Sequence, residues 1–412
     1  MLKSELLEII ANGENSGVEF KRDDIRSEKM AKEIVAMANF QGGRILLGVE
    51  DDGTISGIQR LDLEEWVMNV FRDLVHPMLI PFYEEVQVDP NTRVAVVSFP
   101  TGVSKPYVVR HRGGEEIYIR VGTTSRLATR EQQARLFSVG GLLHTELMPV
   151  AGTDLRTLDR ARLTDYLKDV INDPEIPASD FDWETRAQGL GLLATSDTGT
   201  VMCTVAGLVL FGINARRFLR QAGLRLMVFH GPEKEYDATL DITIDAPLVG
   251  RWVRDSEGRM LVDQGLIERF MEHLTPHVST IVDPNDELRR DKHWHYPIEA
   301  IREVVLNALT HRDWTRNIEV EVVVYSDRLE VISPGTLPNS MTIAKMIAGQ
   351  RSPRNTIITE IMRDYGYVDA RGMGVRRKVL PLMRTENRSE PVFHSTDDFL
   401  KTTLPRLLER EV

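Results

Sequence analysis

The chain has 412 residues, of which 42% are hydrophobic, enough for a sizeable core divided among two or three domains. Its formal net charge of −11 excludes a protein that coats nucleic acid over its whole surface, because such binding needs a basic face, but it is compatible with a local basic groove. No apolar run reaches the roughly 18 residues of a membrane span and no signal-sequence pattern opens the chain, so we expect a cytoplasmic protein without a membrane partner.

Residues 1–140 are expected to form an α+β domain. The stretch "EKMAKEIVAMANF" (28–40) predicts an amphipathic helix, and "RILLGVE" (44–50) predicts a buried strand. The "DDG" turn at 51–53 indicates a hairpin whose return strand is "TISGI" (54–58). Further alternating runs predict strands over 83–88, 93–99, 106–110 and 116–122.

Two further domains are expected, a middle helical and mixed region over 141–285 and a third module over 286–412. The middle region has helical patterns at 163–171 and 185–194, while "TVAGLVLFG" (204–212) fits either a buried helix or a buried strand. The third module begins near Tyr296 with a helix to about Thr310, followed by strands over 318–326 and 328–333.

The opening stretch "GENSGVEFKRDD" (13–24) brings acids and a base together. Strand alternation places Glu19 and Lys21 on one face, Glu14 precedes them in a turn, and Asp51 follows the buried strand. Three converging carboxylates would supply the hard oxygen ligands that Mg²⁺ or Mn²⁺ prefers, with the lysine beside a phosphate, for phosphodiester hydrolysis. An ordinary solvated turn explains the same residue types.

"ENSGVEFK" and "IVAMANFQGGRILLGVEDDGTISGI" resemble the AlbA-like, Schlafen-type nucleic-acid-binding domain over roughly the first 135 residues. Schlafen nucleases carry two glutamates five apart, a lysine two beyond and a later aspartate, a pattern that falls on Glu14, Glu19, Lys21 and Asp51. The resemblance implies that these four are catalytic, that Glu14, Glu19 and Asp51 bind a metal, and that phage defence is a conceivable role. Many bacterial relatives are described only as regulators.

A basic interval between residues 105 and 135, with Tyr107 and Tyr118 interleaved, predicts a groove for nucleic acid beside these acids. A solvated face is the alternative. The predicted contacts are Lys21, Arg22, Lys105, Arg110, Arg112, Arg120 and Arg126.

In "YPIEAIREVVLNALTHRDW" (296–314) a polar stripe of Glu299, Glu303, Asn307 and His311 recurs every four residues opposite an apolar face. The stripe is compatible with a solvated helix face or with a site, and asparagine is a mediocre helix former whose presence propensity does not explain.

The same segment resembles the first motif of the GHKL-type ATP-binding fold of histidine kinases and gyrase, and most closely that of the RecG-related helicases or regulators. "RLEVISPGTLP" and "DARGMGVRR" resemble the strand and turn that hold adenine and the glycine motif near phosphate. The resemblance implies that Asn307 ligates Mg²⁺ and that Glu303 is the catalytic group of a weak ATPase. The ATP-binding residues implied or proposed are Glu303, Asn307, Ser333 in place of the usual aspartate, Gly335, Arg354, Gly372 and Gly374.

The expected protein therefore joins an AlbA/Schlafen-like domain, a connecting region and a GHKL-like α/β sandwich. No G-x-x-x-x-G-K-[ST] loop occurs, so a P-loop helicase is not expected. The leading hypothesis is an ATP-gated, metal-dependent RNA or DNA nuclease that forms a homo-oligomer. The alternatives are a non-catalytic transcriptional regulator that senses ATP and an ATP-dependent oligomeric scaffold.

Overall fold

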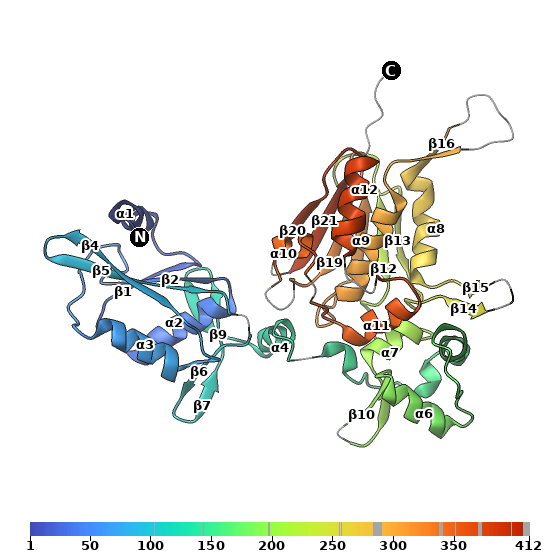
Figure 1. Ribbon diagram of the computed structural model, residues 1–412, viewed down its shortest axis with the longest axis horizontal. Helices are drawn as coiled ribbons and strands as arrows, with labels where there is room; N and C mark the ends of the chain where they lie inside the picture. The colour runs from blue at the N-terminus through green and yellow to red at the C-terminus, as the bar shows by residue number, and fades with distance from the viewer. Residues whose placement is uncertain are drawn as a thin grey trace. The chain divides into compact units, whose positions relative to one another are not determined.

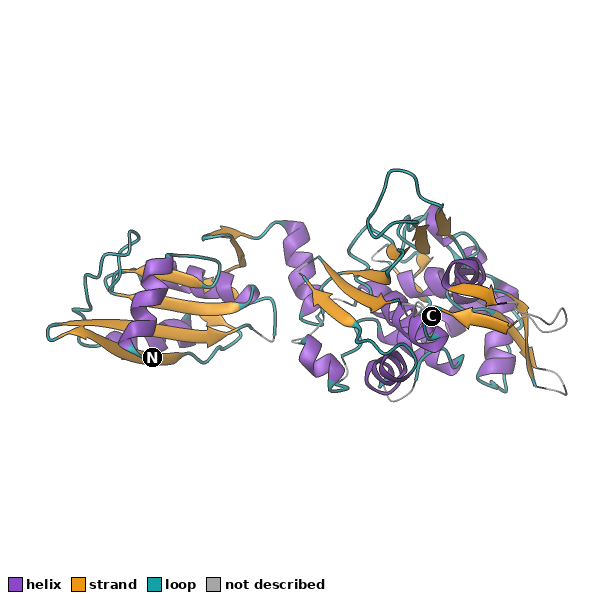
Figure 2. Cartoon of the chain, turned by 90° about the horizontal axis from the view of Figure 1, so that it is seen from above, coloured by secondary structure: helices purple, strands orange, loops and turns teal. Residues whose placement is uncertain are grey.

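The computed structural model describes residues 1–412 except 103, 143, 197, 255, 257, 283–290, 338–340, 351, 370–372, 397 and 407–412. The chain divides into two compact units, Met1–Leu143 and His144–Val412 (Figure 1). Both units mix helices and sheets, which confirms the α+β class (Figure 2). Among the described helices, none combines the length and the apolar composition that a membrane crossing requires.

A four-stranded sheet organises the first unit. Its strands run in the order β1 (Val18–Lys21), β2 (Gly42–Leu47), β5 (Thr92–Pro100) and β4 (Phe82–Asp89), with β1 parallel to β2 and the other pairs antiparallel. Because side chains alternate, Ile45 of β2 packs with α2 (Ser27–Asn39) and α3 (Leu63–Asp73), whereas Leu46 packs with α1 (Lys3–Asn12) on the other face (Figure 1).

The rest of this unit consists of short elements. They are β3 (Val75–His76), β6 (Val108–His111), β7 (Gly114–Glu116), the hairpin β8 (Tyr118–Val121) and β9 (Thr124–Leu127), and α4 (Arg130–Val139). The predicted return strand at 54–58 does not form; a single bridge joins Val49 to Ile55. The chain bends there because Gly48 and Gly57 adopt φ angles of +91° and +74°, and the Gly57 amide donates to the Gly48 carbonyl.

A six-stranded sheet organises the second unit. Its order is β13 (Leu240–Ile244), β12 (Leu224–Val228), β18 (Val320–Val324), β19 (Arg328–Pro334), β21 (Phe399–Pro405) and β20 (Val392–Ser395). The expected boundary at 285/286 falls inside this unit, and β12 from one side of it pairs in parallel with β18 from the other. The main core lies on one face, where Leu226 and Val322 pack with the helices α8 (Leu266–Val278) and α9 (Ile298–His311).

Shorter elements complete the second unit. Residues 204–212, for which helix and strand were both open, contain the helix α7 (Val205–Phe211), all of whose residues are buried. The other helical elements are η1 (Thr145–Leu147), η2 (Leu155–Thr157), α5 (Arg160–Asp165), η3 (Tyr166–Val170), α6 (Asp180–Gly189), η4 (Ala215–Arg217), α10 (Ile343–Ile347), α11 (Thr356–Asp364), η5 (Val375–Val379) and α12 (Leu380–Thr385). The paired short strands are β10 (Leu193–Thr195) with β11 (Val201–Cys203), β14 (Arg251–Arg254) with β15 (Arg259–Asp263), and β16 (Ser279–Val282) with β17 (Asp291–Trp294).

Candidate functional sites

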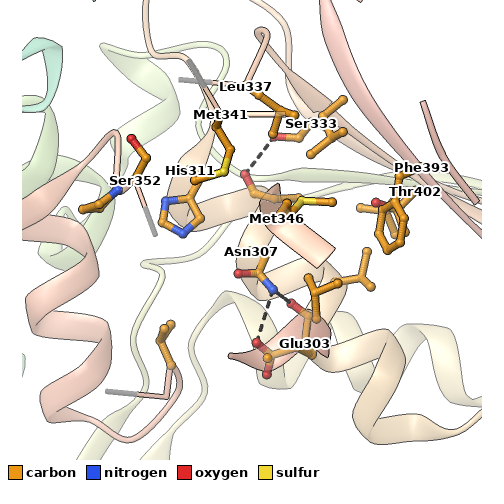
Figure 3. A pocket seen from close by; sticks show the side chains of 18 of the residues that line it. Glu303, Asn307, His311, Ser333, Leu337, Met341, Met346, Ser352, Phe393 and Thr402 are labelled. Atoms are coloured by element: carbon orange, nitrogen blue, oxygen red, sulfur yellow. Dashed lines mark hydrogen bonds between the residues drawn. The ribbon is translucent and has the colours of Figure 1, made fainter. Parts of the chain in front are cut away.

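A pocket in the second unit is lined by one face of α9. Glu303, Asn307 and His311, four residues apart, all lie on its wall (Figure 3). The Asn307 side-chain Nδ2 donates to the Glu303 carbonyl at 2.8 Å and to the Glu303 Oε1 at 3.2 Å. Within the described part of the chain, no donor is bonded to the Asn307 Oδ1, so this oxygen is available to a ligand.

Glu303 is held from two further directions. Its Oε2 pairs with the Lys378 ammonium at 3.4 Å, and its side chain is 7% exposed. A Cβ built on Gly374 would lie 1.6 Å from the Glu303 Oε1, so this close approach of backbone to carboxylate requires glycine. Gly374 lines the pocket, and its contact with ATP stays a prediction. Gly372 lies outside the described residues.

A second part of the wall, next to α9, comes from the end of β19. Ser333 lines the pocket, and its hydroxyl donates to the Ala308 carbonyl of α9 at 3.1 Å, which leaves the oxygen able to accept. Gly335 follows at φ +99°, and a Cβ there would lie 2.4 Å from the Asp313 Cβ. Ser333 and Gly335 are therefore at the predicted pocket, next to the helix that carries Asn307.

Arg354 requires a correction, because it does not lie on the pocket wall as a free phosphate contact. Its side chain is 3% exposed, donates from Nη2 to the Thr336 carbonyl and lies 3.5 Å from the Asp313 carboxylate. Burial lowers the pKa of Arg354, partly offset by the Asp313 charge. Arg354 and Asp313 thus support the turn at Gly335 from behind the pocket.

The pocket also has an apolar wall that the sequence did not indicate. Its members come from β19, β20, β21, α10 and the segment before α10, and they are Val331, Met341, Met346, Phe393 and Leu400, with Thr402 beside them. Threonine is common on both the buried and the solvated face of a strand, so the sequence around Thr402 did not indicate that it lines a pocket.

The polar face of α9 and the apolar wall together suit a nucleotide. The apolar side chains offer a surface for a flat ring, and Asn307 and Glu303 are among the polar groups that line the rest of the pocket. The open Asn307 Oδ1 is a hard oxygen donor of the kind that Mg²⁺ accepts, so the residues present fit a magnesium-bound phosphate chain at this end.

The first unit brings the predicted acids together around Lys21. The Lys21 Nζ lies 2.7 Å from the Glu19 Oε1, 3.6 Å from the Glu14 Oε1 and 3.5 Å from the Asp51 Oδ1. Burial disfavours the ammonium, but the hydrogen bond to Glu19 and the three carboxylate charges outweigh it and raise the pKa of Lys21. Glu14 also accepts from the Phe20 amide at 2.9 Å.

Arg120 requires a second correction. It was expected to contact nucleic acid, but its side chain is 0% exposed and pairs with Glu19 and Glu33. It also donates to the Asn15 carbonyl at 3.0 Å. Arg120 is therefore a buried structural cation that fixes the Glu19 carboxylate from behind.

The predicted metal site at Glu14, Glu19 and Asp51 is not formed. Across the described residues, no three acidic, histidine or cysteine side chains are placed to hold a metal ion together. The reason is that Lys21 occupies the point where the carboxylates converge, and both oxygens of Glu19 are already paired with cations. In this arrangement the three acids surround the Lys21 ammonium, so a divalent ion would bind among them only if it displaced that ammonium.

The other predicted nucleic-acid contacts are divided. Arg112 and Arg126 are exposed, whereas Arg110 pairs with Glu115 at 2.6 Å and Arg22 with Asp24 at 3.3 Å. The Lys105 ammonium donates to the Phe40 carbonyl at 2.9 Å. Tyr107 is 3% exposed and is unable to stack on a base, while Tyr118 is partly exposed.

Comparisons with known proteins match both ends of the chain. Residues 14–129 match the family model described as Schlafen, AlbA_2. Residues 317–404 match the model described as "Putative ATP-dependent DNA helicase recG C-terminal". A search of curated proteins gave no match.

Two solved structures are similar, each at 21% identity. The DIP2311 protein from Corynebacterium diphtheriae matches with a TM-score of 0.44 over 98% of this chain and 80% of that one. The N-terminal domain of a RecG-related protein from Nitrosomonas europaea, named as a putative ATP-dependent DNA helicase, matches with a TM-score of 0.25 over 31% of this chain and 94% of that one. The two family models by themselves show a Schlafen AlbA_2 domain at residues 14–129 and a RecG-type C-terminal domain at residues 317–404.

Proposed function

We propose that the protein binds nucleic acid through its first unit and ATP through its second, and that bound ATP changes the affinity for nucleic acid. The observation that supports this most is the two-sided pocket, with the open Asn307 Oδ1 at one end and the apolar wall at the other. The two domain families, one nucleic-acid-binding and one ATPase-like, support the pairing of the two ligands.

Two residues of the pocket have different roles in this proposal. Asn307 holds magnesium through its side-chain oxygen, and the ion supplies charge neutralisation for the triphosphate when bound. The Glu303 carboxylate, fixed by Asn307 and Lys378, is in position to orient a water molecule, so we propose slow ATP hydrolysis as a finer activity.

Calorimetric titration with Mg²⁺-ATP tests this function. We expect Asn307→Ala to bind roughly 10 to 100 times more weakly, because a bond to a charged group contributes about 1.5–3 kcal/mol. Glu299→Gln is the matched control, since Glu299 belongs to the same helical stripe but does not line the pocket and is 60% exposed. The proposal fails if wild type binds no nucleotide, or if nucleic-acid affinity is the same with and without ATP.

Cleavage of nucleic acid is a second candidate function. The observation that favours it is the convergence of three carboxylates on the single cation of Lys21. Labelled RNA and DNA are incubated with the protein and added Mg²⁺ or Mn²⁺, using Asp51→Asn as the variant because Asp51 is 83% exposed and its loss does not threaten the fold. Cleavage that disappears in Asp51→Asn but persists in Asp89→Asn, at the exposed end of β4, supports the candidate.

Binding without cleavage in every condition would remove the nuclease candidate and leave the regulator. The scaffold alternative and the predicted homo-oligomer are tested by light scattering with and without Mg²⁺-ATP, where an unchanged monomer argues against both.

A further inference from the structure

We propose that the backbone of a bound nucleic acid runs along the N-terminal half of α2, where Arg26, Lys29 and Lys32 form a basic track beside Lys21 and Asp51. This inference rests on the proposed nucleic-acid binding and deepens it, because it moves the phosphate contacts from the strands to a helix face.

The track lies on one wall of a groove in the first unit. The groove is lined by Lys21, Arg22, Asp24, Ile25, Arg26, Lys29, Lys32, Glu33, Glu50, Asp51, Asp52 and Thr54. Cations and carboxylates are equal in number there, so the attraction for phosphate depends on which cations are not already paired with a carboxylate.

Several of these charges have partners. Lys21 is surrounded by the three carboxylates, and Arg22 lies between Asp24 and Glu50 at 3.3 and 4.0 Å. Glu33 pairs with the buried Arg120 at 2.9 Å. These groups contribute little net field to an incoming phosphate.

Arg26, Lys29 and Lys32 differ, because no described carboxylate is ion-paired with any of them. Arg26 and Lys29 are exposed, and Lys32 is partly buried with its ammonium 5.6 Å from the centre of the Tyr118 ring. The three side chains are therefore the free positive charge of the groove.

Their spacing matches a phosphate backbone. Arg26 precedes α2 as its N-cap, and Lys29 and Lys32 follow at intervals of three residues, so the track spans about 9 Å along the helix axis. In duplex DNA one strand has a phosphate about every 3.4 Å of the axis, so the track is long enough to contact about two to three consecutive phosphates of one strand. The groove is also lined by Glu50, Asp51 and Asp52, which come from the segment after β2, and these acids repel phosphate and so direct the backbone toward α2.

Fluorescence anisotropy with labelled single-stranded RNA, single-stranded DNA and duplex DNA over a range of salt concentrations tests the track. The variant is Arg26→Gln with Lys29→Gln and Lys32→Gln in the full chain. The control with the same change in net charge is Arg60→Gln with Arg72→Gln and Arg93→Gln, three arginines of the same unit that already pair with Asp62, Asp73 and Glu85.

We expect the track variant to bind single strands roughly one hundredfold more weakly at about 0.1 M salt, and the slope of log affinity against log salt to fall by about two. The control should keep its slope. If wild type binds no nucleic acid, the proposed function itself fails. If wild type binds and the track variant keeps both affinity and slope, or loses no more than the control, the function stands and the track is wrong.

Discussion

Each unit of this protein holds a buried glutamate against a lysine, and the two arrangements differ in what surrounds the pair. In the first unit both oxygens of Glu19 meet cations, Lys21 at 2.7 Å and Arg120. In the second unit Glu303 meets Lys378 at 3.4 Å and the amide of Asn307, whose own oxygen stays open to the pocket. In the first network both carboxylate oxygens of Glu19 are paired, whereas in the second the side-chain oxygen of Asn307 has no hydrogen-bond donor among the described residues.

The difference teaches how each site is to be tested. Because Glu19 is paired on both sides with buried or partly buried cations, we expect its removal to lower stability more than it weakens binding. The open oxygen of Asn307 contributes little to stability, so a variant loses only the bonds of the amide to Glu303, about 1 kcal/mol each, and its larger effect is on affinity. Glu19 and Asn307 should therefore give opposite results when stability and binding are measured on the same variants.

Glu19→Ala should have the largest effect on stability. It leaves Arg120 buried with Glu33 as its remaining carboxylate, and breaking one side of a buried ion pair costs about 3–5 kcal/mol of unfolding free energy. Urea unfolding followed by circular dichroism measures it. Asp51→Ala, which removes an exposed acid that meets the same lysine, should change the unfolding free energy by less than about 1 kcal/mol. Equal losses of unfolding free energy in the two variants would show that the buried ion pair of Glu19 with Arg120 does not stabilise the fold.

Gly335→Ala should lower the unfolding free energy of the second unit by about 3 kcal/mol. The new Cβ lies 2.4 Å from the Asp313 Cβ, and the φ angle of +99° is strained for alanine. Gly366→Ala is the control, because Gly366 has φ +79° but no atom within 4 Å of the built Cβ, so it should cost about 1 kcal/mol. Thermal unfolding compares the two, and a smaller loss at Gly335 would mean that the turn relaxes freely.

Local patterns predicted the elements that carry both sites. The periodicity of residues 28–40 and 298–310 gave the helices α2 and α9, and four-residue spacing put Glu303 and Asn307 on one wall. Alternation placed Glu19 beside Lys21, as the 2.7 Å contact shows.

Contacts between distant segments set the rest. Alternation in β8 shows that Arg120 shares a face with Tyr118, but not that Glu19 and Glu33 would bury it. Phe393 and Thr402 reach the pocket from strands more than 80 residues beyond α9, and Arg354 is buried by Asp313 and Thr336. Each outcome depends on tertiary packing that no local window contains.

Glu146→Gln should cost the second unit about 1–3 kcal/mol. The carboxylate is 0% exposed and accepts from the Thr356 hydroxyl and from the Ile357 and Ile358 amides, so it caps the start of α11. An amide in its place turns a donor toward these donors. Urea unfolding measures the loss, and Glu360→Gln on the exposed side of the same helix should change it by less than about 0.5 kcal/mol. A stable Glu146→Gln protein would mean that α11 does not depend on this cap.

Ser333→Ala should have the smallest effect, and it isolates one hydrogen bond of the proposed nucleotide site. Losing the bond to the Ala308 carbonyl costs about 1 kcal/mol of unfolding free energy. If the hydroxyl oxygen accepts from the amino group of adenine, the variant binds ATP about 2 to 10 times more weakly, while inosine triphosphate, which lacks that amino group, binds as before. Calorimetric titration of both nucleotides tests this contact. An equal loss of affinity for ATP and inosine triphosphate would show that Ser333 shapes the pocket without contacting the base, because a purely structural change does not distinguish the two bases.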